Sequence, residues 1–348
     1  RSLPAYAGAA PVRLSQLQQR LAGSGAAVLE LVLLDGELAA FHITADDAAV
    51  HRSPLDGRDF GALAETACRG DAGAARELYD VLIRPFAAQL SGAQRLIIVA
   101  DSSLQTIPFA ALLDASSGRP LVERVPVAVA PSAGALVPQA VAVPESIVAV
   151  GVGSGRREAA LPASRAELDE LTRYYRRSIA AQPTFRALVD AASRADVVHI
   201  SGHAEPQGRA GEAAIVFPGP RRGMEERVSW RRAAAESLRG EPVVVLAACE
   251  TLRPSRSPSA HTLSLGGGFL AAGAGDVIGT LAPIPDNDAR AIFDRIHRHL
   301  AGGYDAAGAL RLAQLEALAA EARGEERTAW RSVALLTRRI PIREEGPS

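Results

Sequence analysis

The chain has 348 residues, 48% of them hydrophobic, and its 38 Lys and Arg residues nearly balance 39 Asp and Glu residues. A formal net charge of -1 gives no general attraction for polyanions, so we expect neither nucleic acid nor a membrane as a direct partner. The composition is that of a folded globular protein and excludes a disordered chain.

The first half of the chain predicts a helix, a pair of strands, and further helices that lead to a buried strand. Helical apolar spacing covers residues 14–23, and residues 26–43 contain two strands joined at Asp35-Gly36, a strong hairpin signal. Helical patterns over 60–92 precede an apolar run at 95–101, which is typical of a strand buried on both faces of a sheet. We therefore expect an α/β arrangement.

The second half alternates strands and helices more regularly. Strands are predicted within 146–154, 195–206 and 241–252, with helical segments between them. This alternation predicts a mainly parallel sheet covered on both faces, in which ligands bind beyond the carboxyl ends of the strands. The proline-bounded stretch 138–146 is the predicted boundary between an N-terminal domain, 1–143, and a C-terminal domain, 144–348.

The sequence contains two cysteines, Cys68 and Cys249. Two isolated cysteines fit neither a disulfide framework nor the ligand spacing of a zinc site, so we expect no metal and a reducing compartment. No apolar run reaches the roughly 18–20 residues of a membrane span, and the opening letters RSLP lack the order of a signal peptide. These features predict a fragment of a cytoplasmic protein.

Two reactive side chains follow predicted strands directly. His203 comes after one apolar run and Cys249 after another, so both should emerge at the same edge of the sheet. A cysteine beside a histidine is what nucleophilic catalysis needs, because the thiolate is the reactive form and the imidazole exchanges its proton. Taken alone, a cysteine at the end of a strand is more often a small core residue.

The segments around both residues resemble the two signature motifs of CHAT domains, a family of caspase-like and separase-like cysteine peptidases. The signatures usually run close to HfacHG and vLSACeT, and the corresponding letters here are VVHISGHAEP and VVVLAACETL. Other segments are similar to the family in the same order: LSQLQQRLAGSGAAVLELVLLDGELAAFHIT, RLIIVADSSLQTIPFAALLD, LPASRAELDEL and GGGFLAAGAGDVIGTLAPIPDNDARAIFDRIHRHLAGG.

This resemblance implies an α/β fold of the caspase type, a three-layer αβα sandwich with a mainly parallel sheet, preceded by a degenerate pseudo-caspase-like half. It implies a cysteine endopeptidase that acts on a protein substrate without a cofactor, with an activating partner or a fused repeat region as a further expectation. The alternatives are a catalytically inactive CHAT-like scaffold or sensor, and a hydrolase or transferase acting on small acyl groups.

Carried over to this sequence, the resemblance makes His203 the catalytic histidine and Cys249 the nucleophile. The backbone N–H groups of Ala204 and Cys249 would form the oxyanion hole. The family usually has glycine after the histidine, so alanine at position 204 is a departure that is tolerated only if its backbone angle suits alanine.

The same resemblance places Asp286 in the pocket for the residue before the scissile bond, with Asp288 as the alternative, and a carboxylate there would select arginine or lysine. The competing interpretation is that these residues cap a helix. Ala282 departs from the family, which usually has tryptophan there. Glu205 and Glu250 are candidates for orienting the dyad or lining the pocket, and the alternative is that they are solvated loop carboxylates.

The remaining cysteine and histidines are assigned no chemistry. Cys68 is predicted to be structural and His199 to be a core residue. His261, His297 and His299 are predicted to lie on the surface.

Overall fold

The computed structural model describes residues 11–100, 104–152, 168–207, 212–219, 224–254, 263–325 and 328–342. Its α-helices are α1 (Leu14–Leu21), α2 (Phe60–Cys68), α3 (Ala72–Leu82), α4 (Leu121–Arg124), α6 (Phe185–Ala192), α7 (Trp230–Ala234), α8 (Leu265–Ala271), α9 (Asp286–Ala301) and α10 (Ala306–Ala322). Short 3-10 helices are η1 (Arg84–Phe86), η2 (Gln89–Gly92), η3 (Phe109–Ala111), η4 (Ala133–Ala135) and η6 (Thr328–Ser332).

The strands are β1 (Ala26–Leu34), β2 (Glu37–Ile43), β3 (Ala48–Pro54), β4 (Arg95–Ala100), β5 (Val127–Ala130), β6 (Val137–Ala140), β7 (Ser146–Val152), β8 (Arg177–Ser178), β9 (Val197–Gly202), β10 (Ala204–Gln207), β11 (Glu212–Pro218), β12 (Glu225–Val228), β13 (Val243–Ala247), β14 (Asp276–Thr280), β15 (Val333–Thr337) and β16 (Arg339–Ile342).

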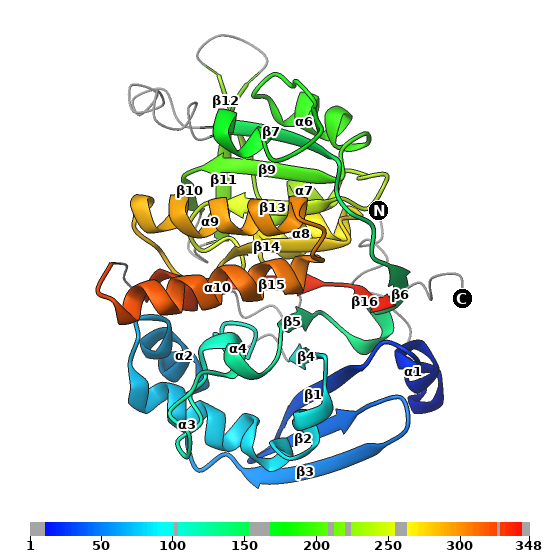
Figure 1. Cartoon of the computed structure of the whole chain (residues 1–348), viewed down its shortest axis with the longest axis vertical. Coiled ribbons are helices and arrows are strands. Elements are labelled where there is room, and N and C mark those ends of the chain that lie inside the picture. The colour runs from blue at the N-terminus through cyan, green and yellow to red at the C-terminus, as the bar shows by residue number, and fades with distance from the viewer. Residues whose placement is uncertain are drawn as a thin grey trace.

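One large sheet runs through the whole molecule. Its 11 strands lie in the order β3-β2-β1-β4-β5-β15-β14-β13-β9-β7-β8, so strands from both halves of the chain belong to one sheet (Figure 1). The ladders from β14 through β13 and β9 to β7 are parallel, and β1, β4, β5 and β15 are parallel to one another. The predicted mainly parallel α/β fold is confirmed.

The join between the halves is made by β15. This strand, near the end of the described chain, pairs with β14 in the antiparallel sense and with β5 in the parallel sense. The stretch 138–146, predicted from its prolines to be a boundary, is partly a strand: β6 ends at Ala140 and pairs with β16. The proline pattern missed this pairing because β16 lies about 200 residues further along the sequence.

Local sequence explains both the hairpin near one edge of the sheet and the burial of the interior strand β13. The Asp35-Gly36 turn joins β1 and β2 as predicted, and Gly36 has a φ of 81°, which glycine adopts without strain. Strand β13 alternates between two cores because successive side chains point to opposite faces. Val244 and Leu246 enter the core that includes α8, and Val243 and Val245 enter the core that includes α9 and α10.

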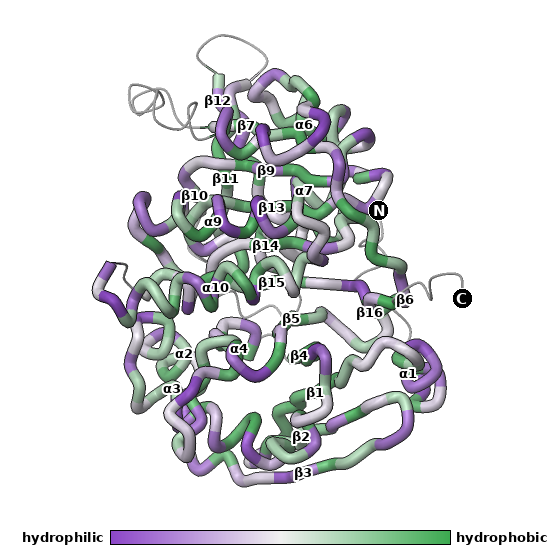
Figure 2. The backbone as a smooth tube through the Cα atoms, in the orientation of Figure 1, coloured by the Kyte–Doolittle hydropathy of each residue, from purple (hydrophilic) through white to green (hydrophobic). Residues whose placement is uncertain are grey.

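Helices cover both faces of this sheet, as expected for a three-layer αβα arrangement. Figure 1 shows α9 and α10 crossing in front of the C-terminal strands, and Figure 2 shows that the strands behind them are predominantly hydrophobic. These two helices have 16 and 17 residues. Within the ranges that the structure describes, no helix is long and apolar enough to cross a membrane.

Candidate active site

The register of two central strands places His203 and Cys249 at equivalent positions. Strands β9 and β13 are parallel neighbours, and their ladder ends with Ala247 opposite Ser201. His203 and Cys249 each follow two residues after this last pair, at the carboxyl edge of the sheet. His203 is exposed and Cys249 is half-buried, so both can be reached from solvent.

The backbone on the histidine side is fixed by a close approach to the next strand. A Cβ atom added to Gly202 would lie 2.5 Å from the backbone oxygen of Val152, so only glycine fits directly before His203. Ala204 then begins β10, opposite Ile215 of β11. Ala204 is not among the residues with positive φ, so alanine replaces the family's glycine here without backbone strain.

The loop after Cys249 is anchored to β14 by two buried threonines. The Thr251 hydroxyl oxygen accepts a hydrogen bond from the Thr280 amide at 3.1 Å, and the Thr280 hydroxyl donates to the Ala248 carbonyl at 2.9 Å. The Leu252 amide also donates to the Thr280 carbonyl at 2.9 Å. Leaving one partner of such a buried hydrogen bond unpaired costs about 1–3 kcal/mol. These bonds therefore hold the cysteine loop in place.

Glu250, directly after the cysteine, has an unusual backbone. Its φ of 56° is left-handed, which costs about 1–3 kcal/mol in a residue other than glycine. Its carboxylate accepts a hydrogen bond from Nη1 of Arg253 at 2.6 Å. Such strain at a residue beside a reactive group persists only where the surroundings hold it.

The other glutamate predicted near the dyad is also paired with arginine. Oε2 of Glu205 lies 3.5 Å from Nη2 of Arg227, which in turn lies 3.6 Å from Glu225. Glu205 and Glu250 thus lie next to His203 and Cys249 in the chain, as predicted, but each faces an arginine of this protein. An internal cation already offsets each of these carboxylates.

Asp286 and Asp288 lie in the first turn of α9, which begins six residues after the end of β14 and so starts near the same edge of the sheet. The cap residue is Pro285, and no side chain caps this helix, so the capping interpretation is wrong. Asp286 is exposed. Asp288 is half-buried, and its Oδ2 is a buried oxygen without a hydrogen-bond partner in the described part of the protein.

Cys68 and His199 are both buried in the interior of the protein. Cys68 is buried in α2, and burial raises the pKa of its thiol to about 11, with Ser332 and the charge of Arg253 opposing the shift. Its predicted structural role agrees with this burial. His199 is fully buried, as predicted.

His297 corrects one prediction, because it is fully buried rather than on the surface. Its Nε2 lies 2.9 Å from Nδ1 of His199, and its Nδ1 lies 2.8 Å from the hydroxyl of Tyr175. The helical pattern of α9 hid this burial, because histidine reads as polar in a hydropathy pattern. His299 is half-buried against Glu316, and His261 lies outside the described residues.

Burial sets the charge state of this chain of polar groups. It lowers the pKa of His199 to about 3, and burial followed by the charge of His199 lowers the pKa of His297 well below its ordinary value. Burial also raises the pKa of Tyr175. Both histidines are therefore neutral at pH 7, and Nε2 of His199 has no hydrogen-bond partner among the described residues.

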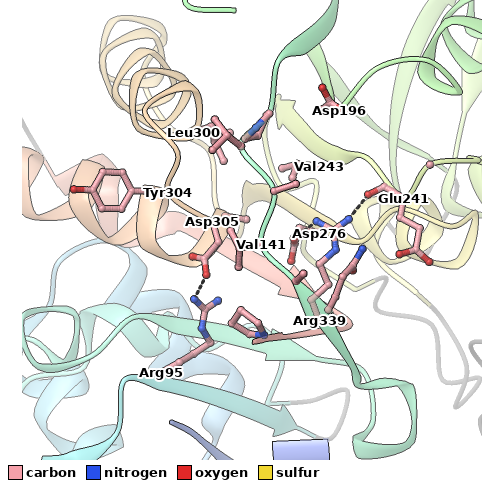
Figure 3. A pocket seen from close by; sticks show the side chains of 18 residues that line it. Arg95, Val141, Asp196, Glu241, Val243, Asp276, Leu300, Tyr304, Asp305 and Arg339 are labelled. Atoms are coloured by element: carbon pink, nitrogen blue, oxygen red, sulfur yellow. Dashed lines mark hydrogen bonds and ion pairs between the residues drawn. The ribbon is translucent and has the colours of Figure 1, made fainter. Parts of the chain in front are cut away.

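A cavity of about 160 Å³ lies at the opposite edge of the sheet, where β4, β13 and β14 begin (Figure 3). Four of its charged side chains form two ion pairs: Arg95 with Asp305, and Arg339 with Asp276 at 2.9 Å. The cavity is thus separated from the dyad by the length of the strands. In the described residues, no group of three or more histidine, cysteine, aspartate or glutamate side chains is arranged to hold a metal ion.

The fold and the placement of a thiol and an imidazole at the carboxyl edge of the sheet define a caspase-like α/β protein. The chain belongs to the CHAT domain family, whose model matches residues 72–337. No relative with a curated function matches the sequence.

Solved structures that are similar to this chain include a separase and a gingipain. Separase of Saccharomyces cerevisiae, in its complex with securin, has a TM-score of 0.62 and 9% sequence identity, over 92% of this chain and 31% of the separase chain. The Arg-specific cysteine proteinase gingipain R (RgpB), an enzyme of Porphyromonas gingivalis, has a TM-score of 0.47 and 10% identity, over 81% of this chain and 74% of its own. At these identities, the likeness to separase shows the fold. This chain spans about a third of the separase chain.

Proposed function

We propose that this chain is a cysteine endopeptidase that hydrolyses peptide bonds with a dyad of His203 and Cys249. The observation that carries the proposal is their matched position, two residues beyond the last pair of the β9–β13 ladder. Cys249 is also the accessible thiol of the two, since Cys68 is buried. The N-terminal half, 1–143, would serve as its structural partner.

In this mechanism the Cys249 thiolate attacks the carbonyl carbon of the substrate, and His203 carries the proton. The new C–S bond gives a tetrahedral intermediate, which collapses as His203 donates the proton to the departing amine. Water then hydrolyses the thioester, with His203 taking a proton from the water and returning it to the thiolate. The enzyme is regenerated, and the products are a carboxylate and an amine.

The backbone N–H groups of Ala204 and Cys249 would stabilise the oxyanion. Removal of one such donor typically costs about 3–4 kcal/mol of transition-state stabilisation. The ordinary backbone of Ala204 and the threonine-anchored loop after Cys249 support this role, because both donors lie on fixed backbone.

A preference for arginine before the scissile bond belongs to the same proposal. Among the four acidic candidates, Glu205 and Glu250 have arginine partners, while Asp288 has a buried oxygen to which no described residue donates a hydrogen bond. An unpartnered buried carboxylate oxygen is costly unless a ligand satisfies it, which favours Asp288 over the exposed Asp286 as the group that binds a guanidinium.

Replacement of Asp288 by asparagine is expected to lower kcat/KM for an arginine substrate at least about 30-fold, because a buried charge pair with the substrate is lost. Labelling of Cys249 by iodoacetamide should stay within a factor of two. Asp286→Asn is the matched comparison. Loss of arginine preference in Asp286→Asn alone would assign the role to Asp286 instead.

Control by a partner or an upstream region is also proposed. The similar separase structure is a complex with securin, and this chain covers less than a third of separase. A second protein or segment would then raise the activity of this chain above a basal level, and that basal level is what labelling of the isolated chain measures.

The test of the proposed function uses a peptide acyloxymethyl ketone with arginine next to the reactive group. The probe is expected to label Cys249, located by mass spectrometry, and Cys68→Ala should retain the label because Cys68 is buried. A proteome-derived peptide library, compared between the wild type and Cys249→Ala, gives the residue before each cut. Complete absence of labelling and cutting would support the inactive scaffold instead.

A further inference from the structure

Ion pairs of Arg253 connect the cysteine loop with the N-terminal half of the chain. Arg253 lies four residues after Cys249 and contacts the carboxylate of Glu250 at 2.6 Å. Its other terminal nitrogen, Nη2, lies 3.8 Å from Oε2 of Glu65 on α2. One guanidinium thus contacts both the loop that carries the nucleophile and a helix of the N-terminal half.

The backbone of the loop gives this contact a specific role. Glu250 is left-handed, and the Arg253 amide donates to the Glu250 carbonyl at 3.1 Å, which closes a tight turn. The φ angle of Glu250 sets the orientation of the peptide bond between Cys249 and Glu250. A residue other than glycine adopts such a backbone only where a contact favours it, and the side chain of Glu250 has that contact with Arg253.

Arg253 is well placed for such a contact. Its side chain is 24% exposed, against 37% for Glu250 and 45% for Glu65, so Arg253 is the most enclosed of the three. The charge of Arg253 also opposes the rise in the pKa of the buried Cys68 thiol. Cys68 lies one turn after Glu65 on α2. Arg253 therefore lies at the contact between the two halves rather than on an open surface.

We propose that Arg253 is a positioning residue, which holds Glu250 in its left-handed turn and so fixes the Cys249 loop, while Glu65 ties this turn to the N-terminal half. This rests on the proposed function of Cys249. It gives the N-terminal half a direct influence on the reactive loop, through a contact that a change in α2 would alter.

The experiment compares two reagents on each variant. Iodoacetamide needs only a thiolate, whereas the arginyl acyloxymethyl ketone also needs its carbonyl held correctly at the loop. Arg253→Ala is expected to slow ketone labelling about 10–100-fold, the cost of a displacement of roughly 1 Å, while iodoacetamide labelling changes less than threefold. Arg253→Lys should recover part of the rate. The kcat for a peptide should fall more than KM rises.

A matched control and a matched pair distinguish positioning from general stabilisation. Arg69→Ala removes a contact of 2.8 Å with the same Glu65 but does not touch the loop, so its labelling rate should equal that of the wild type. Glu250→Gly should react at least fivefold faster than Glu250→Ala, because glycine adopts the left-handed turn without help. In the Glu250→Gly background, Arg253→Ala should cause no further loss.

Two results overturn the role of Arg253: equal ketone labelling of Arg253→Ala and the wild type, or equal labelling of Glu250→Gly and Glu250→Ala. Equal loss of iodoacetamide and ketone labelling, with a lowered thermal midpoint, would show a purely structural contact and also overturn it. A wild-type protein that the ketone does not label contradicts the proposed function itself, whatever the variants do.

Discussion

Replacement of Cys249 by alanine is expected to abolish peptide cleavage, and replacement of His203 by alanine to lower kcat/KM by about 10²–10⁴-fold. The first change removes the nucleophile. The second leaves the thiol in place but removes the group that takes its proton and returns it to the leaving amine. Initial rates on a fluorogenic arginine peptide measure both effects.

The two variants should remain folded, because the exposed His203 and the half-buried Cys249 make none of the core contacts described for their neighbours. Thermal unfolding midpoints close to that of the wild type check this point. The exposed His51 on β3 provides a control, since His51→Ala should cleave at the wild-type rate. Wild-type cleavage by His203→Ala would exclude His203 as the proton carrier.

Acidification is expected to destabilise the fold steeply below about pH 6.5, because His199 and His297 are buried and neutral in the folded protein. Their pKa values are lowered on folding, so the unfolded chain binds more protons. The stabilisation is complete above the unfolded-state pKa and is lost as the pH falls. Two such groups give a slope of about 2.7 kcal/mol per pH unit in the free energy of unfolding.

For His199 this loss continues down to about pH 3, where the folded form binds its proton as well. Burial also lowers the pKa of His42, which adds to the slope in the same direction. Urea unfolding between pH 4.5 and 7.5 measures the dependence. The double variant His199→Gln/His297→Gln should show a shallower slope. An unchanged slope in the double variant would contradict this account.

The sequence predicted the parts of the molecule that depend on local pattern. Apolar runs located the strands that end before His203 and Cys249, and the parallel sheet follows from their alternation with helices. The small residue before the histidine also proved necessary, because Gly202 leaves no room for a Cβ atom.

Contacts between residues far apart in the sequence were missed. Thr280 anchors the cysteine loop from 29 positions away, and Tyr175 reaches His297 across 122 positions. Neither contact leaves a periodic signal, because threonine, tyrosine and histidine fit many environments. The proposed choice of Asp288 over Asp286 likewise rests on which oxygen is buried, and a helical pattern does not contain that information.

The central position of β15 affects the order in which this protein can be completed on the ribosome. Residues 333–337 fill the gap between β5 and β14, so a nascent chain that ends before them has two unpaired strand edges. Strands β5 and β14, which flank the gap, are already synthesised, but each still lacks β15 as its neighbour. The dyad strands β9 and β13 lie on one side of that gap, and β1, β2 and β4 lie on the other. A continuous sheet therefore forms only after synthesis has passed residue 337, which delays the joining of the two halves until nearly the whole described chain has been made.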